Sequence, residues 1–505
     1  MSKIKSLVAL AATAGLVMGG VTASHAATQK SVTIGLIADL QSWAAASSQF
    51  GNLNLPYQAV YDSLLVATPD GTVKPNVATK FVYDKAGTTL TLTIKQGLKY
   101  TDGTALDAAN VVKNLVAFQK GDSPDASNLG SMVSATAKGK DTVVIKLKDV
   151  DPAFINYLAR NAGLLESSKE IGAKDAKTNP VGSGPYILNK IKSKTGSIYV
   201  LDRNPKYWNK AAYPYDQIVL KPISDPTAMV NALESGQVDA ANLANNDVIT
   251  ELMANGIKFE TSTLDLVGLY LVDRTGALKT PIANVKVRQA INYALDRKAL
   301  LKTIGSGYGQ VVEQPFSPKS AGYIPALNST YSYDPAKAKA LMAEAGYANG
   351  FTMEMPSIVA FLGEAPFTLI SDELKAIGIT VKYTEEPFST FFPHILTPVY
   401  PGYLMFLEQS PNAWQFLNFL IARTAVWNPD HYGDATSDDL LNKIQHSTGA
   451  TQAKYLKQLN TYMVQQAWFA PFYVKQTTFA HNSSVKMTVQ AGNAVPYLSS
   501  FKPAK

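Results

Sequence analysis

Two kinds of hydrophobic spacing occur along this chain, and they restrict its fold more than any other feature. Residues 31–37, 88–100 and 141–149 place apolar side chains at every second position, which is typical of strands with one buried face. Segments 106–118 and 284–309 space them three and four positions apart, as amphipathic helices do. Strands and helices do not strictly alternate in the first 180 residues, so we predict a mixed α/β fold. The chain has 505 residues, 46% of them hydrophobic, which is enough for several domains.

The predicted helices begin and end at residues that suit those positions. Asp107 is expected to cap the helix at 106–118. Asp334 is expected to cap a later helix, which has Pro335 at its first position and ends at Gly346. Residues 437–476 are predicted to form two amphipathic helices followed by a strand.

The first 26 residues have the features of a cleavable export signal. Lys3 and Lys5 provide a basic start, and the apolar stretch that follows is too short and too rich in glycine for a membrane span. Ser24 and Ala26 suit positions −3 and −1 of a signal-peptidase site. The chain has no cysteine, so we expect neither a disulfide nor a lipid anchor on cysteine. We therefore expect a soluble protein outside the cytoplasm, either periplasmic or secreted.

Motifs that would indicate an enzyme, a cofactor or a metal site are missing. The Gly-Ser-Gly sequences at Gly182 and Gly305 lack the third glycine of a dinucleotide-binding loop and the Gly-Lys-Ser/Thr of a P-loop. No Gly-x-Ser-x-Gly is present, and the histidines after the signal are scattered. The net charge of +7 includes no basic run of five residues. We predict no catalysis, no cofactor, no bound metal and no nucleic-acid partner.

Residues 179–210 are predicted to form a β-hairpin with aromatic ends. Gly182 and Gly184 are expected to let the chain turn sharply before a strand that begins at the Pro-Tyr-Ile-Leu sequence. Residues 193–197 then form a turn, and a return strand leads to Tyr207 and Trp208. We interpret this segment as a structural device without chemistry of its own.

The same segment resembles the signature of the extracytoplasmic solute-binding proteins of the peptide/nickel class (oligopeptide-binding-like, family 5), which are receptors of ABC importers. The match runs from Asn179 through "GSGPYIL" to "LDRNPKYW". Segments 92–115, 232–242 and 287–300 are similar to further blocks of this family in the same order, although Asn110 stands where an Asp is usual. The resemblance extends over essentially the whole chain after the signal.

The resemblance implies a two-lobe periplasmic-binding-protein fold (type II, cluster C-like), with three domains and a hinged ligand cleft. The expected domain boundaries are 27–60, 179–270 and 477–505 for domain I, 61–178 for domain II, and 271–476 for domain III. A monomer is expected to capture a small polar solute and deliver it to the membrane permease subunits of an ABC importer. A peptide or peptide-like solute is expected first, with an oligosaccharide or an opine-like conjugate as the alternative. Scattered histidines disfavour metal uptake.

Two loops beside the expected lobe crossings supply candidate ligand-binding residues. In the first, Asp39 offers a charge and Trp43 a stacking face, although Trp43 equally suits packing within domain I. In the second, the candidates are Tyr270, Asp273 and Arg274. The alternative interpretation is that Asp273 and Arg274 pair with each other on the surface.

The third candidate loop lies at residues 403–417. Many peptide-binding members of the family have a Trp-x-x-Asp run here, and its Asp takes the α-amino group of the peptide. This chain lacks that Trp and Asp, and Glu408 is the acid nearest to the position. Glu408, Gln409 and Trp414 are the candidates, with Glu408 as the acceptor for a ligand amine. A secreted glycosidase is the remote alternative, in which two carboxylates such as Glu408 and Asp273 would flank a glycosidic bond.

Overall fold

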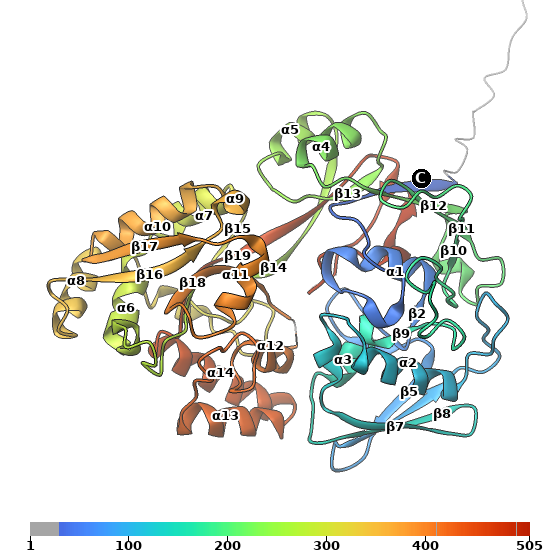
Figure 1. Ribbon diagram of the computed structural model, residues 1–505, viewed down its shortest axis with the longest axis horizontal. Helices are drawn as coiled ribbons and strands as arrows, with labels where there is room; N and C mark the ends of the chain where they lie inside the picture. Colours follow the sequence, from blue (N-terminus) through green and yellow to red (C-terminus); the bar gives the residue numbers. More distant parts are fainter. Residues whose placement is uncertain (1–29, 411, 491, 505) are drawn as a thin grey trace, which may run out of the picture.

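The computed structural model describes residues 30–410, 412–490 and 492–504. Figure 1 shows two lobes side by side, and both the first strand and the C-terminal end of the chain belong to the same lobe. Two long strands, β14 (Lys258–Leu271) and β19 (Phe469–His481), run from one lobe into the other. The prediction of a mixed α/β fold is confirmed. The predicted export signal lies outside the described residues.

One nine-stranded sheet extends through both lobes. Its order is β10-β11-β12-β1-β13-β19-β14-β18, and β15 pairs with β19 beside this path. The strands besides β14 and β19 are β1 (Ser31–Leu36), β10 (Tyr186–Leu188), β11 (Tyr199–Arg203), β12 (Gln217–Pro222), β13 (Ala240–Asn242), β15 (Gly309–Val311) and β18 (Gly402–Glu408). β1 runs parallel to β12 and β13, while β14 runs antiparallel to both of its neighbours, β18 and β19.

A second sheet and several short elements complete the lobe that holds the chain ends. The sheet is antiparallel in the order β5-β6-β8-β7, and α2 lies against it. Its strands are β5 (Ala78–Tyr83), β6 (Thr89–Ile94), β7 (Met132–Lys138) and β8 (Thr142–Leu147). The helices of this lobe are α1 (Asn54–Val60), α2 (Ala108–Lys120), α3 (Phe154–Leu158), α4 (Pro226–Glu234) and α5 (Ile249–Ala254). The short strands are β2 (Asp62–Ser63), β3 (Leu65–Ala67), β4 (Val73–Pro75), β9 (Leu164–Leu165), β20 (Val485–Lys486) and β21 (Lys502–Pro503).

The other lobe is mainly helical. It contains α6 (Val285–Ala294), α7 (Arg297–Gly305), α8 (Pro335–Glu344), α9 (Val359–Leu362), α10 (Ala365–Lys375), α11 (Phe388–Ile395), α12 (Ala413–Leu420), α13 (Ala435–Gln445) and α14 (Gly449–Gln465). A parallel pair, β16 (Phe351–Ser357) and β17 (Ile379–Glu385), lies among them. The predicted pair of helices followed by a strand is confirmed as α13, α14 and β19. Within the described ranges, no helix is long and apolar enough to cross a membrane.

The predicted helix ends follow from local chemistry. The Asp107 side chain accepts a hydrogen bond from the Asn110 backbone N–H at the start of α2, and Asp334 does the same for Lys337 at the start of α8. Gly346 follows α8 with φ of +86°, a conformation that glycine adopts without strain. These three predictions are confirmed.

The hairpin at residues 179–210 forms as β10 and β11, and the chain bends at residues 183–185 just before β10, where the turn was predicted. Neither Gly182 nor Gly184 has a positive φ, so the bend does not depend on a conformation that only glycine adopts readily. Both glycines instead lie against the backbone of Val60, and a Cβ on Gly182 would overlap the Val60 carbonyl oxygen. They are required because two backbone segments pass very close to each other.

The aromatic end of this hairpin is anchored to a buried carboxylate. Tyr207 donates to Asp62 at 2.8 Å, Trp208 donates to it at 3.3 Å, and Ser183 donates at 2.9 Å. Burial raises the pKa of Asp62 to about 6, although the three donors oppose this shift. The motif that resembles the family therefore holds the hairpin to β2, which supports its interpretation as a structural device.

The ladder between β14 and β19 is irregular at the point where the sheet passes between the lobes. Residues 258–263 of β14 pair with residues 476–481 of β19, and the register shifts between Thr263 and Leu266. From Leu266 onward, β14 pairs with β18 in the second lobe as well as with β19. A register shift bends and twists a strand locally. The shift falls inside the segment 179–270 that we assigned to domain I, and the predicted domain boundaries stay predictions.

Candidate ligand-binding cleft

A cavity of about 500 Å³ lies between the lobes. Its volume is within the range of about 300–1,000 Å³ that is typical of ligand sites. Residues 49–51, 124–131 and 148–160 form its wall on the side of the chain ends, and residues 408–445 contribute from the helical lobe. A ligand in this cavity would touch both lobes at once.

Arg160 lies at the centre of the contact between the lobes. It follows α3, and its guanidinium lies over the Phe50 ring at 4.2 Å from the ring centroid. It donates to the Glu408 carboxylate at 3.2 Å and to the Gly492 carbonyl oxygen at 3.1 Å. Our sequence reasoning missed this residue. The available signal was that Arg160 is the only arginine between residues 61 and 178, where every other cationic side chain is a lysine.

Glu408 is the last residue of β18 and lines the cavity. This position agrees with its prediction as a candidate in the loop at residues 403–417. Its side chain is 32% exposed, whereas that of Arg160 is 11% exposed. Burial raises the pKa of the Glu408 carboxyl, the nearby Arg160 charge opposes this, and the charges of Asp265 and Asp125 add to the rise. Because one Glu408 oxygen already accepts from Arg160, its role as the acceptor for a ligand amine stays a prediction.

Three further acids line the cavity, and protein donors hold each of them. Asp125 accepts from the Phe50 backbone N–H at 2.9 Å, and Asp151 accepts from the Ser131 hydroxyl at 2.7 Å. Burial raises the pKa of Asp151. Asp149 faces His446 of the helical lobe at 3.1 Å. With Glu408 included, carboxylates outnumber the cationic residues of the wall, which are Lys148 and Arg160.

Aromatic side chains and a second contact between the lobes come from α12. Trp414, Phe416 and Phe419 of this helix line the cavity, so the predicted position of Trp414 at the cleft agrees with the structure. Asn412 caps α12, and its amide also donates to the Pro152 carbonyl at 3.1 Å and to Asn156 at 2.9 Å across the cleft. The cap therefore fixes both the helix and its distance from the opposite lobe.

A smaller cavity of about 180 Å³ adjoins the larger one. Gly51 and Glu408 line both cavities, which makes them the boundary between the two. Asp265 of β14 and Lys475 of β19 lie in the wall of the smaller cavity. The sequence reasoning did not single out either residue.

The first candidate loop lies away from the cavity wall. Trp43 is buried in the core of the first lobe, with its ring in edge contact with Tyr199 at 5.5 Å between centroids. Asp39 accepts from the Tyr199 hydroxyl at 2.7 Å. Gln409 is buried next to Glu408, where its amide donates to the Pro315 carbonyl. The structure therefore places these three candidates in packing or hydrogen-bonding roles.

The second candidate loop is buried within the helical lobe. Tyr270 stacks on Tyr403 at 5.7 Å between ring centroids. Asp273 accepts from the Thr280 hydroxyl at 2.6 Å and from two backbone N–H groups of the loop that follows it. Asp273 does not reach either cavity, so the geometry offers no support for a glycosidase pair with Glu408.

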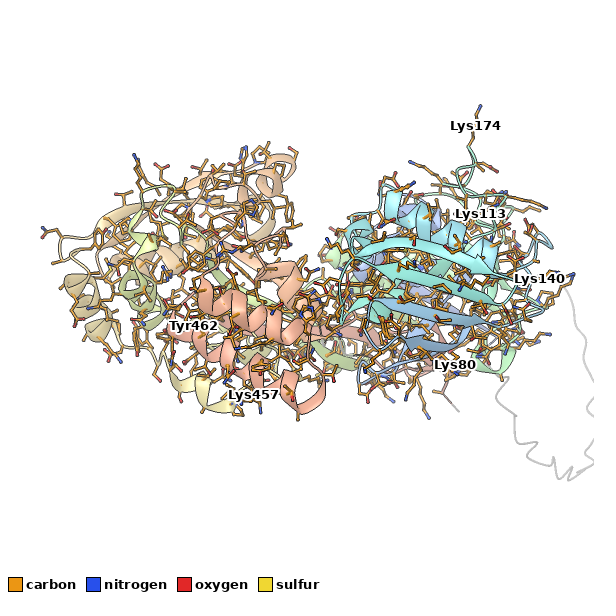
Figure 2. The ribbon with its side chains drawn as sticks, turned by 90° about the horizontal axis from the view of Figure 1, so that it is seen from below. Lys80, Lys113, Lys140, Lys174, Lys457 and Tyr462 are labelled. Atoms are coloured by element: carbon orange, nitrogen blue, oxygen red, sulfur yellow. The ribbon has the colours of Figure 1, made fainter. Side chains whose placement is uncertain are left out.

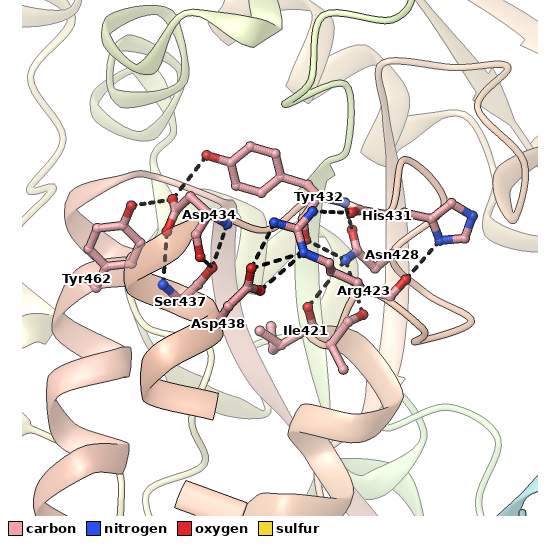
Figure 3. A network of polar contacts seen from close by, with 10 residues as sticks. Ile421, Arg423, Asn428, His431, Tyr432, Asp434, Ser437, Asp438 and Tyr462 are labelled. Atoms are coloured by element: carbon pink, nitrogen blue, oxygen red, sulfur yellow. Dashed lines mark hydrogen bonds and ion pairs between the residues drawn. The ribbon is translucent and has the colours of Figure 1, made fainter. Parts of the chain in front are cut away.

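Arg274 is also buried, and its partner is Asp430 at 3.3 Å. The proposed surface pair of Asp273 with Arg274 is therefore wrong, because the two side chains are bound in different places. Arg274 also donates to Asn428 at 2.7 Å, and Asn428 belongs to the network in Figure 3 that holds the loop between α12 and α13. In that network Arg423 pairs with Asp438 at 2.8 Å. This region fixes the position of α12 at the cleft.

Comparison with known families agrees with this geometry. A sequence model described as "Bacterial extracellular solute-binding proteins, family 5 Middle" matches residues 72–447. The chain belongs to this family. The hairpin anchored at Asp62 is thus part of a solute-binding protein of family 5, and it lies outside the walls of both cavities.

Relatives of this family 5 protein are named for the solutes that they bind. The glutathione-binding protein GsiB of Pectobacterium atrosepticum is 30% identical over 312 residues, which cover 60% of this chain and 59% of the relative. The heme-binding protein A of Haemophilus influenzae is 28% identical over 328 residues, which cover 59% and 58%. The chain thus aligns with about three fifths of the length of these relatives. Both are binding proteins by name.

Solved structures show the fold over nearly the whole chain. The periplasmic binding protein AgaA of A. tumefaciens in complex with agropinic acid has a TM-score of 0.79 at 22% identity, with 94% of this chain and 99% of that chain covered. DppA of Helicobacter pylori in complex with the peptide STSA has a TM-score of 0.78 at 21% identity, with 94% and 98% covered. The expected two-lobe periplasmic-binding-protein fold is confirmed.

Proposed function

We propose that this protein is the extracytoplasmic substrate-binding receptor of an ABC importer. In this function it captures a small polar solute between its lobes and delivers it to the permease subunits in the membrane. The observation that carries the proposal is the cavity of about 500 Å³, because both lobes contribute to its wall. A solute that contacts both lobes stabilises the closed form over the open one.

The proposed solute is a peptide or a peptide-like molecule. The cavity combines the carboxylates of Asp125, Asp149 and Glu408 with the Arg160 guanidinium and the aromatic rings of α12, which suits a compact solute with polar and apolar parts. The names of the relatives and solved structures include binders of glutathione and of short peptides. An oligosaccharide or an opine-like solute is the alternative, and the complex of AgaA with agropinic acid favours keeping it.

Binding alone is sufficient for this function, and the mechanism needs no covalent step. A dissociation constant near 1 μM corresponds to about 8 kcal/mol of binding free energy. Part of this energy drives closure of the hinge, and the permease then distinguishes the closed form from the open one. The solute is released in the same chemical form in which it was bound.

Export is part of the same proposal. The first 26 residues would be removed, and the mature protein would act as a soluble monomer in the periplasm or an equivalent space. N-terminal sequencing of the protein from native cells should begin at Ala27. A retained Met1 would contradict this part of the proposal.

Mass spectrometry of the small molecules released on denaturation tests the function most directly. We expect a stoichiometric polar compound, and re-addition of that compound should raise the melting temperature because it binds the native state. The compound should be recovered intact after prolonged incubation with the protein. Chemical conversion of the compound would contradict a receptor and would indicate an enzyme.

A further inference from the structure

One side of the antiparallel sheet β5-β6-β8-β7 faces solvent. α2 packs against the other side, which carries buried residues such as Leu92 and Ile145. Alternate side chains of each strand point the opposite way, so they form what we call the open face. Lys80, Thr93, Thr142 and Lys138 stand in one row across this face. The positions of the open face are 80 and 82 in β5, 89, 91 and 93 in β6, 142, 144 and 146 in β8, and 134, 136 and 138 in β7.

The open face is basic and carries short side chains between its charges. Lys80, Lys138 and Lys146 are its charged residues and are exposed, while threonine, serine or valine occupies the other positions. Asp84 and Asp141 lie beyond the strand ends, where each accepts hydrogen bonds from groups of its own turn. Among the described residues of the open face, three positive charges therefore have no neutralising carboxylate.

A second group of lysines lies on the same side of the molecule, in the helical lobe. α14 carries Lys454 and Lys457 and has no acid among its 17 residues. Both lysines line an open groove of about 930 Å³, in which the nearby Asp439 already pairs with Lys443 at 2.6 Å. Figure 2 looks onto this side and shows the sheet and α14 together, with Lys80 and Lys457 labelled. Both lobes thus present cations in one direction.

The chemistry of the open face indicates what kind of partner it fits. Strong protein contacts usually depend on aromatic or arginine side chains that fill pockets. The open face has neither residue type at the positions that define it. Lysine is a flexible point charge that contacts phosphate without a fixed geometry. A flat array of lysines between short hydroxyl side chains therefore suits a layer of phosphate headgroups, in which charges have no fixed positions.

We propose that this side of the protein, formed by the open face together with Lys454 and Lys457, docks reversibly on an anionic phospholipid surface. The inference goes beyond the proposed receptor function and does not depend on the identity of the solute. Because each lobe supplies cations, both lobes would rest on the membrane. The receptor would then reach a permease by diffusion along the membrane surface.

Co-sedimentation with lipid vesicles tests the docking. Vesicles of phosphatidylglycerol and phosphatidylethanolamine should bind the protein at about 0.05 M salt, where the Debye length exceeds about 10 Å, and should release it at about 1 M salt. Neutral phosphatidylcholine vesicles should not bind it. Wild-type protein that ignores the anionic vesicles, or that binds both kinds of vesicle equally, would overturn the inference.

A matched pair of triple variants tests the face. Lys80→Gln, Lys138→Gln and Lys146→Gln together should weaken vesicle binding about 100-fold, because each lysine near an anionic surface strengthens binding about fivefold. The control removes the same charge from the first lobe outside the open face, through Lys113→Gln, Lys120→Gln and Lys174→Gln. Figure 2 labels Lys113 and Lys174 away from the open face.

The control variant should lose less than about threefold in binding, since its lysines would lie farther from the lipid than a Debye length. All six lysines are exposed, so both variants should keep the melting temperature of the wild type. Equal weakening by both variants would show that net charge rather than the open face governs binding, and would overturn the inference.

The orientation of the bound protein provides an independent test. The chain has no cysteine, so Thr136→Cys in the open face and Lys113→Cys on α2 would each carry a single dye. Brominated lipid in the anionic vesicles should quench the dye at position 136 but not the dye at position 113. Equal quenching at both positions, or quenching at position 113 alone, would contradict the proposed orientation.

Two further measurements separate the inference from its alternatives. Binding to soluble poly-L-glutamate but not to anionic vesicles would overturn the inference and would indicate an acidic protein as the partner. Lys80, Lys138 and Lys146 lie outside the walls of both cavities, so their triple variant should bind the solute as the wild type does. A failure to bind vesicles would therefore leave the receptor function intact.

Discussion

Replacement of Arg160 by methionine should shift the protein towards an open form. Arg160→Met keeps most of the side-chain volume but removes the ion pair with Glu408, the hydrogen bond to the Gly492 carbonyl and the contact with the Phe50 ring. Each of these contacts joins segments that are far apart in the sequence, and the ion pair joins the two lobes. The variant therefore tests whether this guanidinium holds the lobes together.

The expected magnitude follows from the exposure of the pair. Exposed ion pairs contribute about 0.2–1 kcal/mol, whereas removal of one partner of a buried pair costs about 3–5 kcal/mol. The Arg160 side chain is 11% exposed and that of Glu408 is 32% exposed, so the contact falls between these limits. We expect a loss of about 1.5–3 kcal/mol, the range for hydrogen bonds to charged groups. The ratio of closed to open molecules would then fall about 10- to 150-fold.

Single-molecule energy transfer between the lobes measures this ratio directly. The chain has no cysteine, so Lys140→Cys and Lys457→Cys would place two dyes without removal of any native thiol. Figure 2 shows these two lysines on different lobes. Arg203→Met, which breaks an ion pair within one lobe, is the matched control. An unchanged dye distance in Arg160→Met would refute the reasoning, even if the melting temperature fell.

Two further predictions separate the cleft from the core and test its pH dependence. Trp414→Ala should weaken ligand binding in calorimetric titrations while the protein stays folded. Trp43→Ala should instead lower the free energy of unfolding by about 3–5 kcal/mol, because it leaves a void in the core. If both variants weakened binding equally, our placement of the cavity wall would be contradicted. The hydrogen bond to the Asn442 carbonyl and the Asp149 charge raise the pKa of His446. The ion pair of His446 with Asp149, which joins the two lobes, is therefore fully present below the ordinary pKa of histidine. This ion pair is lost as the pH rises through the raised pKa. The dye distance should therefore increase between about pH 5.5 and about pH 8 in the wild type but not in His446→Gln.

Local patterns predicted the elements of this fold well. Alternating apolar residues mark β6 and β8, and Asp107 and Asp334 cap their helices as expected, because these features depend on residues only a few positions apart. The purpose of Gly182 was not predictable from such patterns. Its constraint comes from Val60, which lies more than one hundred positions earlier in the chain.

The site was less predictable because its partners are distant in sequence. The resemblance placed Glu408 and Trp414 at the cleft through one loop, and both line the cavity. Arg160 and Asp265 became visible only when tertiary structure brought them next to Glu408 from separate elements. Trp43 suited a stacking face and a core position equally well, and only its packing against Tyr199 distinguishes them.

The pairing of β14 with β19 has a consequence for the modular construction of the protein. Thr263 and Gln476 are direct partners in the ladder just before the register shift, and everything between them belongs to the helical lobe or to its connection. Partners in an antiparallel ladder are about 4.5–5.5 Å apart at their Cα atoms, which a two-residue hairpin turn can span. The helical lobe is therefore an insertion into a continuous hairpin. A gene segment for another receptor's lobe could be exchanged at these two positions without any change in the path of the remaining chain.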